Sequence, residues 1–127
     1  MSVPVPGAYL SEDGAYKIQI NSANSSNSQI DAVYEAQNSP VGGIQQKGNI
    51  GQYYWVYSKK AGRDGVAPFS IRFQAMQRPD GRPYTIEDSW VGYYLENNTM
   101  VLDGVRSYVN SDGVTDTSSL GTHTFKM

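Results

Sequence analysis

The stretch that decides the fold is Phe-Ser-Ile-Arg-Phe-Gln-Ala, residues 69–75. Apolar side chains occupy every second position of this stretch, and polar side chains fill most of the positions between them. Such alternation is typical of a β-strand with one face buried and the other in water. A period of two recurs at residues 15–20 and 29–36. No window shows the i, i+3, i+4, i+7 apolar spacing of a helix, so we predict an all-β protein.

Turn signals rich in Gly, Asn, Asp and Pro separate the alternating runs. Asp-Gly pairs such as Asp13-Gly14 and Asp112-Gly113 supply the positive φ that tight hairpin turns require. Seven such signals imply eight strands. We place these strands near residues 6–12, 15–21, 28–37, 48–58, 66–77, 84–95, 98–109 and 117–126.

Consecutive strands joined by short turns form an antiparallel, up-and-down meander. Eight strands are also enough for a sheet to close on itself and hold one small ligand. Closure removes the exposed edges that invite aggregation. We therefore predict a single domain over residues 1–127, an eight-stranded antiparallel up-and-down β-barrel. The alternative is a two-sheet β-sandwich.

Composition excludes several classes of partner. The formal net charge is -2, and no basic cluster is present to neutralise a phosphate backbone, so we expect no nucleic-acid partner. No apolar run approaches the about 20 residues that span a bilayer, so we expect a soluble protein with no membrane partner. Cysteine is absent, which excludes disulfides. Residues 1–6 do not resemble a signal peptide, which leaves open a cytoplasmic protein or a secreted one whose signal was removed.

Four segments resemble successive strands of one family. Residues 7–14, Gly-Ala-Tyr-Leu-Ser-Glu-Asp-Gly, resemble its Gly-x-Trp-x-Asn-x-x-Gly, and residues 32–36, Ala-Val-Tyr-Glu-Ala, resemble its Gly-x-Tyr-x-Ser. Residues 90–94, Trp-Val-Gly-Tyr-Tyr, resemble Trp-x-Gly-x-Tyr, and residues 120–125, Leu-Gly-Thr-His-Thr-Phe, resemble Val-Gly-x-Asp-x-Phe. The chain is similar over nearly its whole length to the biotin-binding barrels of the avidin/streptavidin family. The resemblance implies an avidin-like barrel with biotin as its ligand.

Several positions that the resemblance implies for the biotin ring carry other residues. Ser11 stands where the family has Asn, Ala15 and Ala36 stand where it has Ser, and His123 stands where it has Asp, whereas Tyr34 is kept. A site built for polar partners loses affinity when those partners are removed. We therefore expect biotin, or a biotin-like heterocycle, to bind with weakened affinity.

The resemblance also implies aromatic walls around the ligand. Phe69 and Trp90 fill two of these walls, while the third falls near Val105 or Arg106, where no aromatic stands. Asp88 lies two residues before Trp90 and so on the same face of its strand. The ligand-binding residues that we predict are Ser11, Tyr34, Phe69, Asp88, Trp90 and His123.

Each of these residues also has a purely structural interpretation. Trp90 is then a packed core aromatic, the Tyr34 hydroxyl donates to a backbone carbonyl, and His123 is a structural donor. A buried Asp88 needs a donor, which Arg72, Tyr34 or His123 could supply. In a register one residue off, Asp88 instead faces water.

Residues 53–57, Tyr-Tyr-Trp-Val-Tyr, place aromatic side chains on both faces of a strand. An exposed aromatic row usually marks an interaction surface. We expect the row formed by Tyr53, Trp55, Tyr57 and Tyr93 to be the contact of a homo-oligomer. A flat ligand such as a sugar ring is the other occupant considered.

No catalytic constellation is visible in the sequence. It has no Cys, no Gly-x-Ser-x-Gly elbow and one His, and the adjacent Glu87 and Asp88 face opposite sides of a strand. The segment 110–116 lacks the ligand set of a Ca²⁺ loop, so we predict no metal site and no cofactor. We expect a non-enzymatic binder of a small organic ligand. The alternatives are a lectin-like, carbohydrate-binding module and a small barrel enzyme that shapes a reactive substrate in its cavity.

Overall fold

The fold is described by a computed structural model covering residues 4–24, 26, 29–36, 44–52, 66–77, 84–95 and 98–127, with the backbone alone at 44–52, 66–67 and 75–77. These ranges contain no helix that could cross a membrane. The strands are β1 (Gly7–Ser11), β2 (Tyr16–Asn24), β3 (Gln29–Ala36), β4 (Ile44–Gln52), β5 (Val66–Gln77), β6 (Tyr84–Leu95), β7 (Thr99–Asn110) and β8 (Thr115–Lys126).

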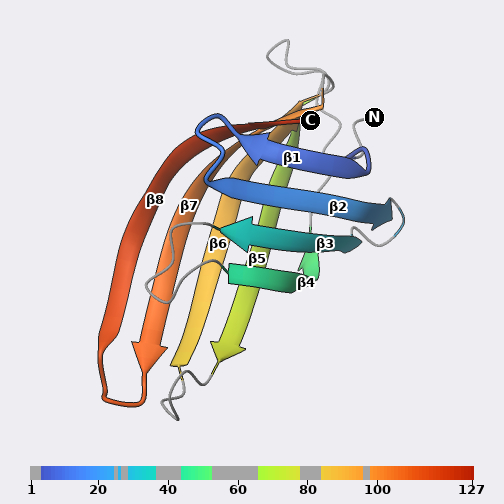
Figure 1. The fold of residues 1–127 in the computed structure, drawn as a ribbon. Coiled ribbons are helices and arrows are strands. Elements are labelled where there is room, and N and C mark those ends of the chain that lie inside the picture. Colours follow the sequence, from blue (N-terminus) through green and yellow to red (C-terminus); the bar gives the residue numbers. More distant parts are fainter. Residues whose placement is uncertain are drawn as a thin grey trace.

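The strands belong to one antiparallel sheet, in the order β4-β3-β2-β1-β8-β7-β6-β5. The sheet curls back on itself so that β1 meets β8 (Figure 1). β4 and β5, the two ends of the order, lie against each other. The sheet is therefore nearly closed into a barrel, and the prediction of an all-β, antiparallel protein is confirmed.

Curling gives the sheet two layers that cross (Figure 1). One layer holds the shorter strands β1–β4, and the other holds β5–β8, each of which is 12 residues long. The long strands extend past β4 in the view of Figure 1. Because β1 and β8 are hydrogen-bonded, the layers are parts of one sheet and not the separate sheets of a sandwich.

Strand bounds agree with the predicted ranges at β5 and β6 and differ at β4. The prediction placed a strand at 48–58, whereas β4 is Ile44–Gln52. β4 is rich in Gln, Gly, Asn and Lys, and its pairing with β3 runs from Ala36↔Ile44 to Gln29↔Gln52. Backbone pairing needs no apolar side chain, so such a strand leaves no alternating pattern to detect. Residues 53–58 lie outside the described part of the chain.

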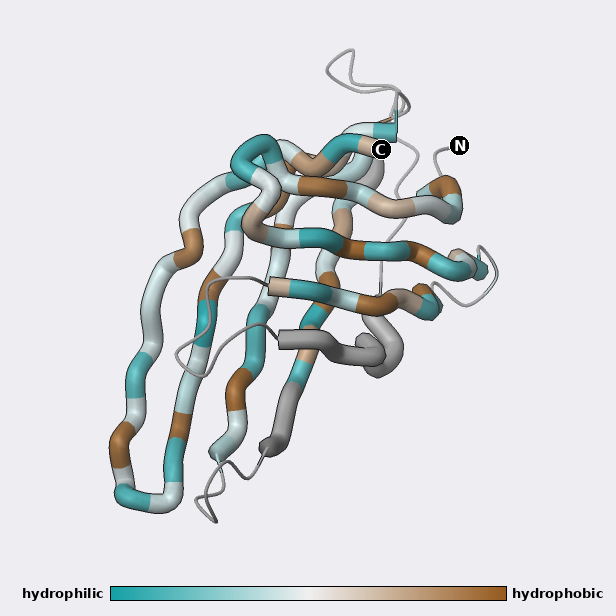
Figure 2. Tube along the Cα trace, viewed as in Figure 1, coloured by the Kyte–Doolittle hydropathy of each residue, from teal (hydrophilic) through white to brown (hydrophobic). Residues whose placement is uncertain are grey.

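The core fills the space between the crossing layers. Buried and exposed residues alternate along β2, β3 and β6, and Figure 2 shows hydrophobic positions alternating with hydrophilic ones along β2. Burying a large apolar side chain contributes about 1.5–3 kcal/mol. The largest fully buried side chains include Trp90, Tyr9, Tyr34, Tyr94, Phe73 and Phe125.

Two of the predicted Asp-Gly turns are present with the expected backbone conformation. Gly14 has φ 72° and Gly113 has φ 78°, in the left-handed region that favours glycine. In the second turn, the Asn110 Oδ1 accepts hydrogen bonds of 3.0 Å from the backbone N–H groups of Asp112 and Val114. The polar side chain at 110 therefore stabilises the β7–β8 hairpin.

The junction between β1 and β8 is short. The two strands pair only at Leu10↔Lys126 and Ser11↔Phe125. The next outward-facing N–H of β8, that of Thr124, donates to the Glu12 Oε2 at 2.7 Å instead of to a strand. A side chain thus completes the ladder where β1 turns away.

Candidate functional site

Three side chains from three strands form a buried polar cluster. Asp88 on β6 and Arg106 on β7 are direct cross-strand partners. The Arg106 Nε donates to the Asp88 Oδ1 at 2.8 Å, and its Nη2 donates to the Asp88 Oδ2 at 2.9 Å. The Tyr34 hydroxyl, from β3 in the opposite layer, donates to the Asp88 Oδ2 at 2.6 Å. The Asp88 carboxylate therefore accepts three hydrogen bonds inside the barrel.

Burial sets the protonation of the donors. It raises the pKa of Tyr34 far above its ordinary 10.0, and the adjacent Asp88 carboxylate raises that pKa further. For Arg106, burial alone would lower the pKa, but the hydrogen bonds and charge of Asp88 outweigh it and the pKa is raised. Tyr34 thus stays a neutral donor and Arg106 stays a cation.

Aromatic rings surround the cluster. The Tyr34 ring stacks on Phe73, with centroids 4.3 Å apart and planes 6° apart. Trp90 lies on the same face of β6 as Asp88. Its ring packs edge-to-face against the rings of Tyr16 and Phe125, with centroids 4.9 Å and 5.1 Å apart. The polar groups are therefore held in an apolar setting where their charges are poorly screened.

Among the described residues, the indole N–H of Trp90 is a buried polar group without a hydrogen-bond partner. Trp90 is 0% exposed, and its Nε1 has no hydrogen-bond partner in the structure as described. The indole N–H lies close enough to the Tyr34 hydroxyl to lower the pKa of that hydroxyl. The two groups are nevertheless not aligned as a hydrogen bond. An unsatisfied buried donor costs about 1–3 kcal/mol. The site therefore has a donor to offer to a bound acceptor.

Arg106 lies at the mouth of the buried interior. Along the inward face of β7, Leu102 is 0% exposed, Arg106 is 7% exposed and Tyr108 is partly exposed. Opposite Arg106 and Tyr108 on β8 are Ser118 and Asp116, both exposed. Within the described residues, water thus reaches the concave face just beyond the cluster, on the Arg106 side.

Two predicted site residues have other contacts. The Ser11 hydroxyl donates to the Asp13 Oδ1 at 2.7 Å and accepts from the Tyr16 N–H at 3.0 Å, so it stabilises the β1–β2 turn. His123 contacts the Trp90 ring, with centroids 5.8 Å apart. Its Nδ1 lies 2.8 Å from the Glu12 Oε1. Among the described contacts, neither residue touches Asp88.

The carboxylates of the same turn are also held by donors. For Glu12, slight burial would raise the pKa, but its own backbone N–H, that of Thr124 and the His123 ring outweigh it and the pKa is lowered. The pKa of Asp13 is lowered chiefly by its hydrogen bond from the Ala15 N–H. Ionised Asp13 therefore stabilises the β1–β2 turn, and ionised Glu12 links that turn to β8.

The remaining members of the predicted site divide between two levels of the barrel. Phe69 is buried but pairs with Gly92, whereas Phe73 pairs with Asp88 and is the aromatic beside the cluster. Among the donors considered for Asp88, Tyr34 is confirmed. Arg72 is exposed instead, and its Nη1 lies 3.8 Å from the Glu87 Oε1.

Sequence reasoning missed Arg106 and Phe73 as members of the site. The alternation of apolar and polar residues along β7 and β5 could have identified both. Arg106 shares its parity on β7 with the apolar Leu102, and Phe73 shares its parity on β5 with Ile71. A cation at an inward position calls for a buried anion, and that anion is Asp88.

The predicted oligomer row is only partly described. Tyr93 is 36% exposed on the outer face of β6, opposite Val101 and two positions from the exposed Val91. Tyr53, Trp55 and Tyr57 lie outside the described residues. The contact between copies through this row stays a prediction.

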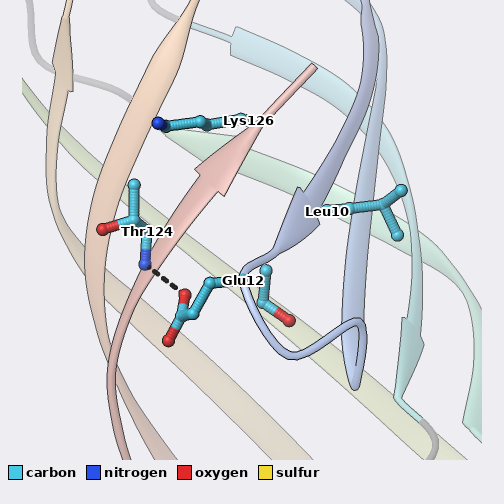
Figure 3. Close-up of a pocket in the computed structure, with 5 residues that line it drawn as sticks. Leu10, Glu12, Thr124 and Lys126 are labelled. Carbon is cyan, nitrogen blue, oxygen red and sulfur yellow. Dashed lines mark hydrogen bonds between the residues drawn. The ribbon is translucent and has the colours of Figure 1, made fainter.

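A cavity of about 410 Å³ opens on the outer surface at the β1–β8 junction. Figure 3 shows Glu12 reaching the Thr124 backbone, while Leu10 and Lys126 point away from each other. The Glu12 carboxylate that lines the cavity is thus already engaged in linking the β1–β2 turn to β8. This cavity is separate from the Tyr34–Asp88–Arg106 cluster.

Comparison of the chain with family models, with curated proteins and with solved structures found no match.

Proposed function

We propose that this protein is a non-enzymatic binder of a small planar organic ligand, held in the barrel beside the Tyr34–Asp88–Arg106 cluster. The observation that carries the proposal is the unpartnered indole N–H of Trp90, fully buried next to a buried ion pair. A ligand acceptor placed there would satisfy a donor that the fold leaves without a partner.

The energetics of the cluster support a role beyond stability. Desolvating two charges costs several kcal/mol per ion, and a well-packed apolar pair of similar volume is often as stable. Stability alone therefore does not call for Asp88 and Arg106 in the core. Perturbed titratable groups held together in this way are characteristic of ligand and active sites.

The donors define the chemistry of the ligand. Trp90 offers one N–H, and Arg106 presents a cation at the mouth of the interior. The surrounding aromatic rings favour a flat, partly apolar molecule. We expect a heterocycle with a carbonyl oxygen, such as a cyclic urea or amide, and entry from the Arg106 side.

Biotin is the ligand implied by the resemblance to the avidin/streptavidin family, and we propose that it binds weakly. The Tyr34 hydroxyl already donates to Asp88. Ala15 and Ala36 carry no hydroxyl. A His123→Asp change, which would restore the family residue, would bring a carboxylate toward Glu12, so Ala36→Ser is the cleaner variant for testing this ligand.

Thermal unfolding with a ligand panel tests the proposal. A ligand that binds only the folded state stabilises it by about 2.7 kcal/mol at a concentration 100 times its Kd. The panel holds biotin, cyclic ureas and amides, and simple sugars. A shift with heterocycles supports the proposal, whereas a shift with sugars alone would indicate a carbohydrate-binding module.

Nuclear magnetic resonance of the indole N–H groups locates the ligand. The chain has two Trp residues, and Trp90→Phe identifies the Trp90 signal by its loss. The heterocycle that raises the melting temperature should move this signal. Phe125→Leu, which perturbs a ring packed on Trp90 without removing an N–H, is the control.

Two results would contradict the proposal. One is a full panel that leaves the melting temperature unchanged. The other is a stabilising heterocycle that leaves the Trp90 signal in place. Mass spectrometry of the recovered ligand separates binding from catalysis, because a binder returns its ligand chemically unaltered.

A further inference from the structure

Among the parts of the chain that the structure describes, no strand pairs with one edge of β8 over most of its length. On one side, β8 pairs with β7 from Thr99↔Lys126 to Val109↔Thr115. On the other side, within the described residues, β1 reaches only the last two residues of the strand. Residues 115–119 are all exposed. An open edge presents a row of N–H and C=O groups on which another strand can pair.

The hairpin shows which groups face outward. The Asn110 N–H donates to the Val114 carbonyl across the turn, so residue 114 directs its carbonyl at β7. In an antiparallel ladder, alternate residues direct both backbone groups to the same neighbour. The residues that direct theirs to the open side are therefore Thr115, Thr117 and Ser119.

The sequence of this edge is chemically symmetric about Thr117. Residues 115–119 read Thr-Asp-Thr-Ser-Ser. In an antiparallel pairing of residues 115–119 with themselves, the facing pairs are Thr117 with Thr117, Asp116 with Ser118 and Thr115 with Ser119. The pairing ends there, because Gly113 and Val114 lie in the hairpin turn and a β-bulge follows Ser119. No like charges face each other, and the carboxylate faces a hydroxyl that can donate to it. Matched cross-strand pairs of this kind stabilise a sheet.

We propose that two copies of this chain associate by antiparallel pairing of their β8 edges, centred on Thr117. A two-fold contact requires a self-complementary surface, and this segment supplies one. The register provides a partner for every outward N–H and C=O of Thr115, Thr117 and Ser119.

Light scattering and sedimentation on the full chain test the association. The mass should rise with concentration from 14.0 kDa toward twice that value. Thr117→Pro removes an outward N–H without touching the β7 ladder, since proline is tolerated where the N–H faces solvent. This variant should remain a monomer, whereas Thr117→Val keeps the N–H and should still associate.

Charge at the centre tests the register. Thr117→Asp and Thr117→Lys each place two like charges face to face, and each alone should associate roughly tenfold more weakly. An equimolar mixture of the two variants should associate at least as well as the unchanged chain, because opposite charges then meet at the two-fold axis. Circular dichroism and thermal melts of each variant confirm that it is folded.

Three outcomes would overturn the proposal. The first is a mass of 14.0 kDa at every concentration up to about millimolar, where even weak specific contacts form. The second is association that persists in folded Thr117→Pro, or a mixture of the Asp and Lys variants that associates no better than either alone. The third is association abolished by Tyr93→Glu and untouched by Thr117→Pro, which would place the contact on the outer face of β6.

Discussion

Arg106 holds Asp88 by two parallel hydrogen bonds, from Nε to Oδ1 at 2.8 Å and from Nη2 to Oδ2 at 2.9 Å, across a direct β6–β7 pair. The Asp88 side chain is 1% exposed and that of Arg106 is 9% exposed. Two ions are therefore fixed in geometry by the sheet register and removed from water by the opposite layer. The predictions that follow depend on this pair and on the rings and turns around it.

Removing one ion of the pair should be far more harmful than removing both. Arg106→Met leaves the Asp88 carboxylate buried without its countercharge and should lower the free energy of unfolding by about 3–5 kcal/mol. The double variant Asp88→Leu/Arg106→Met should recover most of that loss. Urea unfolding of the three variants measures both effects. A loss below about 1 kcal/mol for Arg106→Met would contradict the burial of the pair.

Tyr34→Phe should isolate the contribution of the third hydrogen bond. The change removes the donor to the Asp88 Oδ2 and leaves the ring that stacks on Phe73. Hydrogen bonds to charged groups contribute about 1.5–3 kcal/mol, so we expect a loss of that size in urea unfolding. Tyr108→Phe, at a partly exposed position on β7, is the matched control and should lose less. Equal losses from the two changes would argue against the Tyr34 contact.

Gly104→Ala should displace the Trp90 ring. Gly104 pairs with Trp90 across β6 and β7, and a Cβ on it would lie 2.5 Å from the Trp90 Cζ3. Overpacking of this kind costs about 1–3 kcal/mol. The melting temperature should fall, and the fluorescence of the Trp90 indole should change. Val105→Ala, at the exposed neighbouring position, should leave that fluorescence unchanged, and a silent Gly104→Ala would mean that the ring is not seated there.

The β1–β2 turn, which Glu12 links to β8, should make the protein acid-sensitive. The pKa values of Glu12 and Asp13 are lowered in the fold from their ordinary 4.5 and 3.8. Because the folded pKa lies below the unfolded one, the stability that each carboxylate contributes is complete above its ordinary pKa. It is lost as the pH falls from there through the lowered value.

Melting temperatures recorded between about pH 6 and pH 2.5 check this acid dependence. Glu12→Gln should lower the melting temperature at neutral pH and flatten its decline below about pH 4.5. Asp13→Asn should flatten the part of the decline that begins near 3.8. An unchanged acid profile in both variants would show that the turn carboxylates do not contribute.

The candidate site was predictable in part. Strand parity alone places Asp88 on the same face as Trp90, and both are buried there. The alternation on β7 likewise places Arg106 on the inward face, but the sequence did not show which cation would pair with the Asp88 carboxylate. Arg72, considered from sequence, shares a strand with Phe73 yet has the opposite parity, and the structure leaves it exposed. The partner depended on the register between β6 and β7.

By itself, the sequence determined the class of fold, the Asp-Gly turns and the inward face of strands such as β6, because side-chain alternation and positive φ are local properties of a few neighbouring residues. Only the tertiary structure decided that β4 begins at Ile44, that Tyr34 reaches Asp88 from the opposite layer, and that the Trp90 N–H is left unpaired. These features depend on strand pairing and on how the sheet curls. The free energy of such contacts comes from residues far apart in the chain, and no local pattern encodes which of them will meet.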